Sequence, residues 1–382
     1  MRSRGSSDTL FLISFFAIVI CAGTFLLALP VSWIGSGPEP RALALVDALF
    51  VSTSAVCVTG LSTVNVADFS RFGQYVIMAL IQVGGLGIIS FTSLMLLLPG
   101  RRLPFRRLKT IRGFSVDAVE SDPARIVRNI VLFTFAIESI GAAALYIVLS
   151  HAGTPDGLFA AVFHSVSAFC NAGFSLFPTS MERYNRNPAI LGILAALIVS
   201  GGIGFIVIQD VERRIRGKRR ALSYHSKLVL AATGFLILTG ALAFWLLEKD
   251  GAFAGMGSLD RAANALFQSI TPRTAGFNAV PQAALRQPSK LLTIILMFIG
   301  GAPGSIAGGI KVSTAYLVLL VVLKRANDRG ERNSFKRRLS GATTGAAVTY
   351  FLKAGFLLAA AVGALSLIEG MRGADLGRIV FE

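Results

Sequence analysis

The sequence predicts an all-α polytopic membrane protein, and three observations lead to this fold class. First, 54% of the 382 residues are hydrophobic and only 15% are charged, whereas about a quarter of a soluble protein is charged. Second, apolar stretches long enough to cross a bilayer recur along the chain. Third, the connections between them contain an internal repeat. Together these observations exclude a soluble globular domain.

Seven apolar stretches reach roughly 20 residues, the length that crosses a bilayer core. They lie near residues 9–33, 72–98, 127–150, 189–211, 227–247, 290–323 and 346–368. The sixth contains five glycines and a proline between Gly300 and Gly309. Because glycine and proline break helices, we expect this segment to be interrupted where protein or water surrounds it.

Basic residues are concentrated in alternate connections. Residues 101–112, 213–227 and 324–338 hold 20 of the 37 Lys and Arg residues. By the positive-inside rule these loops, and the amino terminus with them, are predicted to be cytoplasmic. The expected location is the inner (cytoplasmic) membrane, with a lipid bilayer as the surroundings. No aromatic interleaving or nucleic-acid-binding motif accompanies the clusters, so the net charge of +17 does not predict a nucleic-acid partner.

The other connections share the pattern Phe-x-Ser-x-Ser/Thr ahead of a glycine. Copies begin at Phe50, Phe163 and Phe267, the third with one residue fewer before its glycine, and a further Phe follows at position 381. Each copy reads as a short helix of about ten residues, which cannot cross a bilayer and must dip in and return. Re-entrant backbone of this kind is typical of a pore with pore helices and filter loops. Amphipathic outer loops with ordinary turn glycines are the alternative, but they do not explain the shared register.

The repeat therefore predicts a pseudo-fourfold arrangement of helix–pore helix–filter loop–helix units, of which the fourth is incomplete. The predicted units are 1–112, 113–223, 224–338 with a broken second helix, and 339–382, which stops in its pore helix. On this reading we expect the sequence to be C-terminally truncated and a fourth filter glycine to follow it.

Gly60, Gly173 and Gly276 are the predicted filter glycines, because a filter that points successive carbonyls at one axis needs backbone angles open chiefly to glycine. No carboxylate stands beside them, which favours a monovalent over a divalent cation. We expect potassium to bind at the carbonyls of these three glycines. The predicted filter loops comprise Val58, Thr59, Gly60, Asn171, Ala172, Gly173, Thr274, Ala275 and Gly276.

Residues 300–311, in the broken sixth segment, are the predicted gating loop. A flexible glycine loop beneath a filter, carrying the cation Lys311, would obstruct permeant cations until moved. A phosphate loop is excluded because Ile310 separates the last glycine from Lys311 and an apolar helix precedes the loop. The predicted gate residues are Gly300, Gly301, Gly304, Ser305, Gly308, Gly309 and Lys311. Glycine pairs earlier in the chain, at 84–85 and 201–202, indicate close helix packing.

Several polar residues keep two interpretations. Glu138 and Lys353 lie in apolar spans and are either functional or paired with a neighbouring helix. Arg273 either ties down the end of its pore helix through carbonyl hydrogen bonds or tunes ion occupancy by repulsion. His164 is interpreted as a packed side chain of the second pore helix, and His151 and His225 as peripheral.

These motifs resemble the membrane subunit of the Trk/Ktr/HKT superfamily of potassium transporters over essentially the whole chain. The matching segments are Cys57-Val-Thr-Gly60, Phe169-Cys-Asn-Ala-Gly173, Arg273-Thr-Ala-Gly276-Phe-Asn278 and the run from Gly300 to Lys311. The resemblance implies four repeats with one filter glycine each, an intramembrane gating loop, a homodimer and a cytosolic nucleotide-binding regulatory subunit. Because the first span starts at once, the bacterial Ktr-type subunit is the nearer match.

The expected function is therefore potassium uptake across the cytoplasmic membrane through a glycine-lined filter with an intramembrane gate. Sodium or mixed monovalent cation transport by the same pore is the alternative, and coupling to sodium stays open. An enzyme would need facing carboxylates, a His-rich metal motif or a Ser/His pair within the spans, and the sequence offers none. No cofactor is expected in this chain. A structural membrane scaffold would tolerate substitution of the filter glycines without loss of flux.

Overall fold

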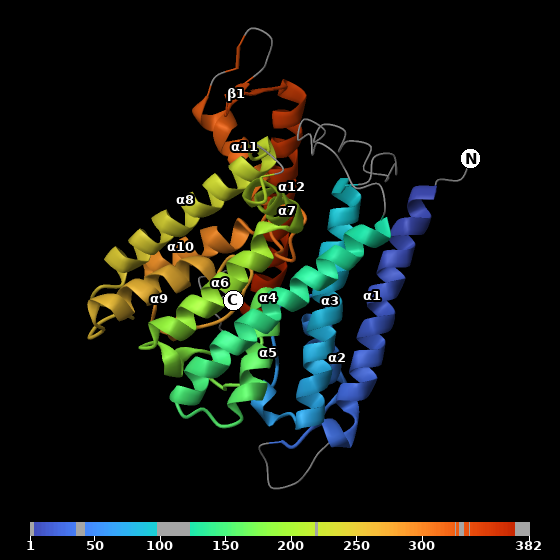
Figure 1. Ribbon diagram of the computed structural model, residues 1–382, viewed down its shortest axis with the longest axis vertical. Helices are drawn as coiled ribbons and strands as arrows, with labels where there is room; N and C mark the ends of the chain where they lie inside the picture. Colours follow the sequence, from blue (N-terminus) through green and yellow to red (C-terminus); the bar gives the residue numbers. More distant parts are fainter. Residues whose placement is uncertain are drawn as a thin grey trace.

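The computed structural model describes residues 4–35, 43–97, 123–217, 221–324, 326–327, 332–335 and 337–370. Within them the chain is almost entirely helical (Figure 1). The predicted basic loop at 101–112 and the predicted fourth pore helix at 381 lie outside these ranges, as do parts of the other two basic loops.

The first predicted unit is a long helix, a short helix and a second long helix that pack side by side (Figure 1). Its elements are α1 (Arg4–Ala28), a 3-10 turn (Pro30–Ser32), α2 (Leu45–Val56), a second 3-10 turn (Val66–Asp68) and α3 (Arg71–Leu97). Pro30 supplies no amide donor and stands where α1 ends. The short helix α2 has 12 residues, which agrees with the predicted re-entrant segment.

The second unit repeats this order, but its last helix is bent. The elements are α4 (Pro123–His151), α5 (Gly157–Phe169), a 3-10 turn (Glu182–Tyr184), α6 (Pro188–Ile203) and α7 (Phe205–Ile215). The sequence predicts one span over 189–211, and the structure divides this stretch into two helices, α6 and α7, that meet at an angle of 101°. Gly204 between them has a φ of +91°, a left-handed conformation that glycine tolerates.

The third unit contains the break that its glycines predict. Its elements are α8 (Tyr224–Leu247), α9 (Ser258–Ile270), a 3-10 turn (Gln282–Ala284), α10 (Gln287–Phe298) and α11 (Val312–Leu323). The predicted gating loop separates α10 from α11. Two short antiparallel strands follow, β1 (Arg332–Ser334) and β2 (Arg337–Leu339), and the chain continues into α12 (Gly341–Gly370). The Ser334 hydroxyl contacts the hydroxyls of Tyr224 and Tyr316, at 2.9 and 2.7 Å, which fastens this hairpin to α8 and α11.

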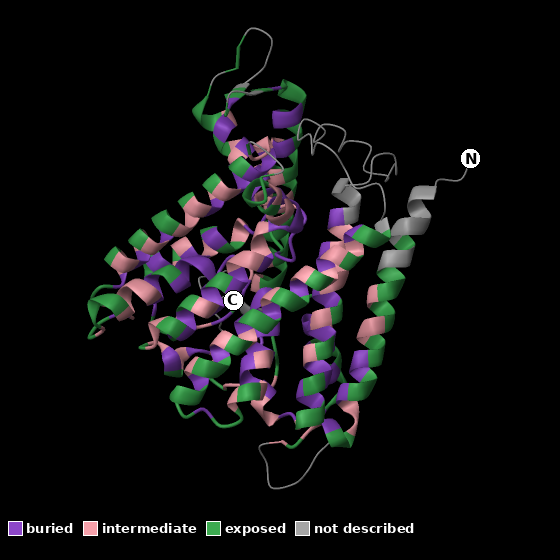
Figure 2. Ribbon diagram, viewed as in Figure 1, coloured by how far each residue is buried: buried purple, intermediate pink, exposed green. Residues whose placement is uncertain are grey.

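Four helices of the described residues are long and apolar enough to cross a membrane by length and composition, or five if the bent α6–α7 pair counts as one span. Large apolar side chains on their outer faces are exposed, for example Ile140 at 66% and Phe356 at 78%. Figure 2 shows exposed residues along much of α1 and α4. Exposed apolar surface of this extent suits contact with lipid, and the chain is a multi-pass membrane protein.

The largest core cluster surrounds the short helices. Phe163, Phe169, Phe174, Phe267 and Phe277 are at most 2% exposed and belong to α5, α9 or the loops that follow these helices. Burying an aromatic side chain contributes about 1.5–3 kcal/mol. The dense packing therefore holds the segments that carry the predicted filter loops.

Candidate ion pathway

The first serine of the Phe-x-Ser-x-Ser/Thr motif has the same role in all three units. Its hydroxyl donates to a backbone carbonyl of the preceding long helix. The three bonds run from Ser52 Oγ to Ile20 O (2.9 Å), from Ser165 Oγ to Glu138 O (2.7 Å) and from Ser269 Oγ to Ile237 O (2.9 Å). A glycine lies three residues after each acceptor, at positions 23, 141 and 240, and a Cβ there would overlap the serine hydroxyl. The motif thus ties each short helix to its outer helix.

The second hydroxyl of the motif reaches the carbonyl directly after the predicted filter glycine. Ser167 Oγ donates to Phe174 O at 2.7 Å, and Thr271 Oγ1 donates to Phe277 O at 2.6 Å. In the first unit Ser54 Oγ is buried and has no hydrogen-bond partner among the described residues. In the second and third units the motif therefore anchors the short helix before the loop and the residue after the filter glycine. These two bonds explain the fixed spacing of the two hydroxyl residues.

Each predicted filter loop contains two residues in the left-handed region, two positions apart. The φ angles are 56° at Val58 and 81° at Gly60, 55° at Asn171 and 73° at Gly173, and 74° at Thr274 and 79° at Gly276. Residues other than glycine are strained at these angles and persist only where the surrounding structure holds them. The sequence predicted the glycines, but it gave no signal for the strained residue that precedes each by two positions.

The structure brings the three predicted filter glycines together, although each comes from a different unit. A Cβ on Gly60 would lie 3.2 Å from Gly173 Cα, and a Cβ on Gly173 would lie 3.1 Å from Gly276 Cα. Gly173 therefore lies between the other two. The carbonyl oxygen of Ala275 approaches within 2.7 Å of a Cβ at Gly173. No side chain other than hydrogen fits at this meeting point.

The last long helix of the first unit, α3, and the helix α6 of the second unit pack closely against the short helices at the predicted glycine pairs. A Cβ on Gly84 would overlap the carbonyl of Val56, and a Cβ on Gly201 would overlap the carbonyl of Phe169. Val56 and Phe169 are the last residues of α2 and α5. The close packing predicted from these glycines is confirmed.

His164 links the short helix α5 to the segment that follows the second filter loop. Its ring is 1% exposed, Nδ1 lies 2.7 Å from Ala160 O, and Nε2 accepts from the amide of Leu176 at 3.3 Å. A ring with Nε2 as acceptor and Nδ1 as donor is the neutral tautomer. The ring also stacks on Phe177 at 4.7 Å. The interpretation of His164 as a packed side chain is confirmed.

His225, in contrast, is 6% exposed in α8. Its interpretation as peripheral is wrong because the helix turns this ring towards the interior. His151 is exposed at the end of α4.

Glu138 lies in a buried polar group between the first two units. It is 4% exposed, its Oε2 accepts from Gln82 Nε2 at 3.0 Å, and its Oε1 lies 3.8 Å from Cys170 Sγ. Gln82 belongs to α3 and Cys170 directly follows α5. The structure thus provides the pairing with neighbouring helices. Lys353 is exposed on α12.

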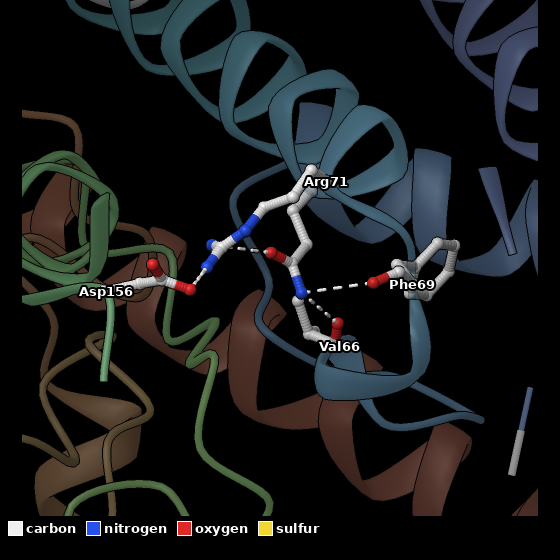
Figure 3. Close-up of polar contacts among 5 residues, drawn as sticks. Val66, Phe69, Arg71 and Asp156 are labelled. Atoms are coloured by element: carbon white, nitrogen blue, oxygen red, sulfur yellow. Dashed lines mark hydrogen bonds and ion pairs between the residues drawn. The ribbon is translucent and has the colours of Figure 1, made fainter. Parts of the chain in front are cut away.

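At the protein surface, Arg71 at the start of α3 forms an ion pair with Asp156 at the start of α5 (Figure 3). The guanidinium also lies over the ring of Phe159, 4.4 Å from its centroid. Gln74 Nε2, one turn further along α3, donates to the carbonyls of Val66 and Phe69. The contacts of Arg71 join the first two units, whereas those of Gln74 tie α3 to the turn before it (Figure 3).

The predicted gating loop is closed at its base. Gly300 N donates to Ile310 O at 3.0 Å, and Ile310 N donates to Phe298 O at 3.1 Å. Within the loop, Ser305 Oγ donates to Ala302 O and Lys311 Nζ to Ala307 O. The loop is therefore a compact turn and not an extended connection.

The gating loop packs against the bend between α6 and α7 in the second unit. Ala302 N donates to Gly202 O at 2.9 Å, and Phe205 N donates to Gly304 O at 3.0 Å. A Cβ on Gly204 would lie 2.8 Å from Pro303 O. The loop also reaches the first unit, since Ile306 Cδ1 would lie 3.8 Å from a Cβ on Gly85. All three units thus contact the loop.

Arg273 makes a carbonyl hydrogen bond, as one of its two interpretations expected, but with a different acceptor. Its Nη2 donates to Gly300 O at 3.1 Å, at the base of the gating loop and not at the end of its own short helix. The carbonyl that its side chain binds thus belongs to the gating loop, and no side-chain bond to its own pore helix is found among the described residues.

Known proteins similar to this chain are cation transporters. The family model described as "TrkH: Cation transport protein" matches residues 4–371. The chain is 35% identical to Ktr system potassium uptake protein B of Vibrio alginolyticus, over all of this chain and 82% of the relative. It is 34% identical to potassium/sodium uptake protein NtpJ of Enterococcus hirae, over 97% of this chain and 81% of the relative.

Among solved structures, the crystal structure of the potassium transporter TrkH from Vibrio parahaemolyticus matches with a TM-score of 0.72 at 21% identity. The match covers 96% of this chain and 73% of that one. At this identity the likeness concerns the fold. Since the family model covers nearly the whole chain and the relatives align along its full length, this protein belongs to the TrkH family of cation transport proteins.

Proposed function

We propose that the chain is a pore subunit for potassium uptake across the cytoplasmic membrane. The observation that carries the proposal is the contact between Gly60, Gly173 and Gly276, three glycines from three units, each at a positive φ. Loops that meet at glycines have room to present backbone carbonyls to one axis, and carbonyls replace the hydration shell of a cation. The proposed filter comprises residues 58–60, 171–173 and 274–276.

Electrostatics at the same place favours a cation. The short helices α2, α5 and α9 end at Val56, Phe169 and Ile270, directly before the three loops. The carboxyl end of each helix carries a partial negative charge of about half an electron. Two relatives are named as a potassium uptake protein and a potassium/sodium uptake protein, which supports potassium first and mixed potassium and sodium transport as the alternative.

The loop at 300–311 is proposed as the gate, with Gly300, Gly301, Gly304, Ser305, Gly308, Gly309 and Lys311 as its residues. It is joined to the third filter segment by the hydrogen bond from Arg273 to Gly300 O, and Gly308 lies near Thr274. Its contacts to the other units are hydrogen bonds between backbone groups and apolar contacts, so it can leave without separating a buried ion pair.

The repeat boundaries, the homodimer and the cytosolic nucleotide-binding regulatory subunit are part of the same proposal. So is the orientation with a cytoplasmic amino terminus. The beginning of α1 lies at the same end of the molecule as the hairpin β1–β2 (Figure 1), which fits one basic side of the membrane.

The filter assignment is tested with Gly173→Ser, measured as rubidium uptake with sodium competition in a host deficient in potassium uptake. A Cβ at Gly173 meets neighbouring backbone and needs a strained φ, so selectivity for rubidium over sodium should fall. The matched control is Gly192→Ser in α6, where a Cβ meets nothing within 4 Å. Unchanged competition in Gly173→Ser protein that reaches the membrane would remove the filter assignment.

A further inference from the structure

A buried guanidinium joins the third filter loop to the base of the gating loop. Arg273 directly precedes Thr274 and is 8% exposed, and its Nη2 donates to Gly300 O at 3.1 Å. Gly300 is also the residue whose amide closes the loop on Ile310. The Arg273 hydrogen bond therefore holds the point from which the gating loop would move.

The next residue contacts the other end of the same loop. Thr274, at a φ of 74°, has its methyl group 3.8 Å from the position of a Cβ on Gly308. Of two consecutive residues in the third filter segment, one thus binds the beginning of the gating loop and the other lies near its end. A displacement of the loop necessarily changes the surroundings of both.

A small recess of about 20 Å³, lined largely by apolar side chains, lies beside Arg273. Asn171 of the second filter loop, Gly202 at the end of α6 and Gly301 of the gating loop line it together with Arg273. Asn171 Oδ1 and Arg273 Nε are buried and have no hydrogen-bond partner within the described part of the chain. An acceptor and a donor that line one recess suit a shared water molecule, since buried polar atoms are nearly always hydrogen-bonded.

Because Arg273 is positively charged and buried, its guanidinium needs hydrogen-bond acceptors nearby. The residues that line the recess include no carboxylate, and a buried charge without hydrogen bonds is costly. With the gating loop in place, Gly300 O supplies one hydrogen bond to the guanidinium. If the loop moves away, the guanidinium loses this acceptor. Only the recess beside Asn171 then remains to hydrate it.

We propose that Arg273 is a positioning residue that couples the filter to the gate, with the recess holding a water molecule shared between Arg273 and Asn171. Arg273 keeps the gating loop in place through Gly300 and the second filter loop through this water. The proposal rests on the proposed function, because it uses the same two loops.

The test measures rubidium uptake and sodium competition in full-length Arg273→Gln and Arg273→Lys proteins, at matched amounts in the membrane. Loss of a charged hydrogen bond changes an equilibrium by about tenfold. Arg273→Gln should therefore raise uptake by about that factor and weaken the preference for rubidium, and Arg273→Lys should restore part of both. Arg186→Gln, at an exposed arginine outside the pathway, should behave as wild type. Wild-type uptake and competition in Arg273→Gln would overturn the proposal.

Combining Arg273→Gln with a deletion of residues 304–308 separates coupling from a general loss of structure. If Arg273 acts through the loop, its substitution adds no further uptake in the deletion protein. An equal increase in both backgrounds would overturn the coupling. The deletion alone tests the gate. High uptake in the deletion with wild-type uptake in Arg273→Gln would refute the coupling and leave the proposed function intact, whereas low, regulated uptake in the deletion would refute the gate itself.

Ile198→Phe provides a second variant that leaves Arg273 and its hydrogen bond in place. Ile198 lines the recess, and the larger side chain should displace the water. Uptake should rise and rubidium preference should fall in the same direction as in Arg273→Gln, by a smaller factor. Wild-type behaviour of Ile198→Phe would overturn the role of the recess.

Discussion

The amide of Phe205 donates a hydrogen bond to the carbonyl of Gly304 at 3.0 Å. Phe205 is the first residue of α7, and Gly304 lies in the middle of the gating loop, so the bend of the second unit and the loop of the third share one backbone contact. Because an amide at the start of a helix has no partner within the helix, the loop satisfies a group that would otherwise be unpaired. The bend of α6–α7 is thus part of the site.

Gly204→Ala should displace the gating loop. The residue has a φ of +91°, and a Cβ would lie 2.8 Å from Pro303 O, so the substitution costs about 1–2 kcal/mol from the conformation alone. We expect a lower Tm and higher cation flux than in wild type. Gly192→Ala in α6 is the control, since a Cβ there meets nothing within 4 Å. Equal Tm and flux in the two variants would contradict this role of Gly204.

Ser167→Ala should destabilise the second filter loop by about 1 kcal/mol, the net value of one intramolecular hydrogen bond, because Ser167 Oγ donates to Phe174 O. Ser54→Ala removes the equivalent hydroxyl of the first unit, which has no partner within the described residues, and should be nearly neutral. Thermal unfolding in detergent measures both. The prediction fails if the two substitutions lower Tm equally.

Asp156→Asn should change stability by less than about 1 kcal/mol, although it removes the ion pair with Arg71. Both side chains are well exposed, at 48% for Arg71 and 69% for Asp156, and exposed ion pairs contribute little because water and salt screen them. Thermal unfolding at low and high salt should give similar Tm differences between variant and wild type. A loss of several kcal/mol would show that this contact between the first two units is more important than its exposure indicates.

Neutralising the basic residues of the 324–338 loop should loosen the complex with a cytosolic regulatory subunit. The expected complex is salt-sensitive, because solvent-exposed charges are screened beyond about 10 Å at 0.1 M salt. The hairpin within this loop is fastened to α8 and α11 through Ser334, so the substitutions should leave the fold intact. Co-purification across a salt series measures the effect. If the amount of co-purified subunit depends on neither the substitutions nor the salt concentration, only the topological role of the loop remains.

Much of the architecture follows from the sequence alone. Hydropathy predicts the membrane class because transfer of side chains into lipid is a local property. The glycines at 60, 173 and 276 indicate their loops, because each has a positive φ that favours glycine and the three pack closely together in the structure. The break after Phe298 is also predictable, because the glycines and the proline that follow it disfavour a continuous helix.

Tertiary structure decided the rest. Residues 189–211 are uniformly apolar, and a straight and a bent helix expose the same side chains to lipid, so hydropathy cannot reveal the turn at Gly204. At that turn the backbone packs against the gating loop, with Pro303 O 2.8 Å from the position of a Cβ on Gly204 and Gly304 O bonded to the Phe205 amide. The acceptor of Arg273 and the burial of His225 likewise depend on neighbours distant in the chain. Local sequence determined which segments are helices and where they can break, and the packing of one unit against the next determined where their ends point.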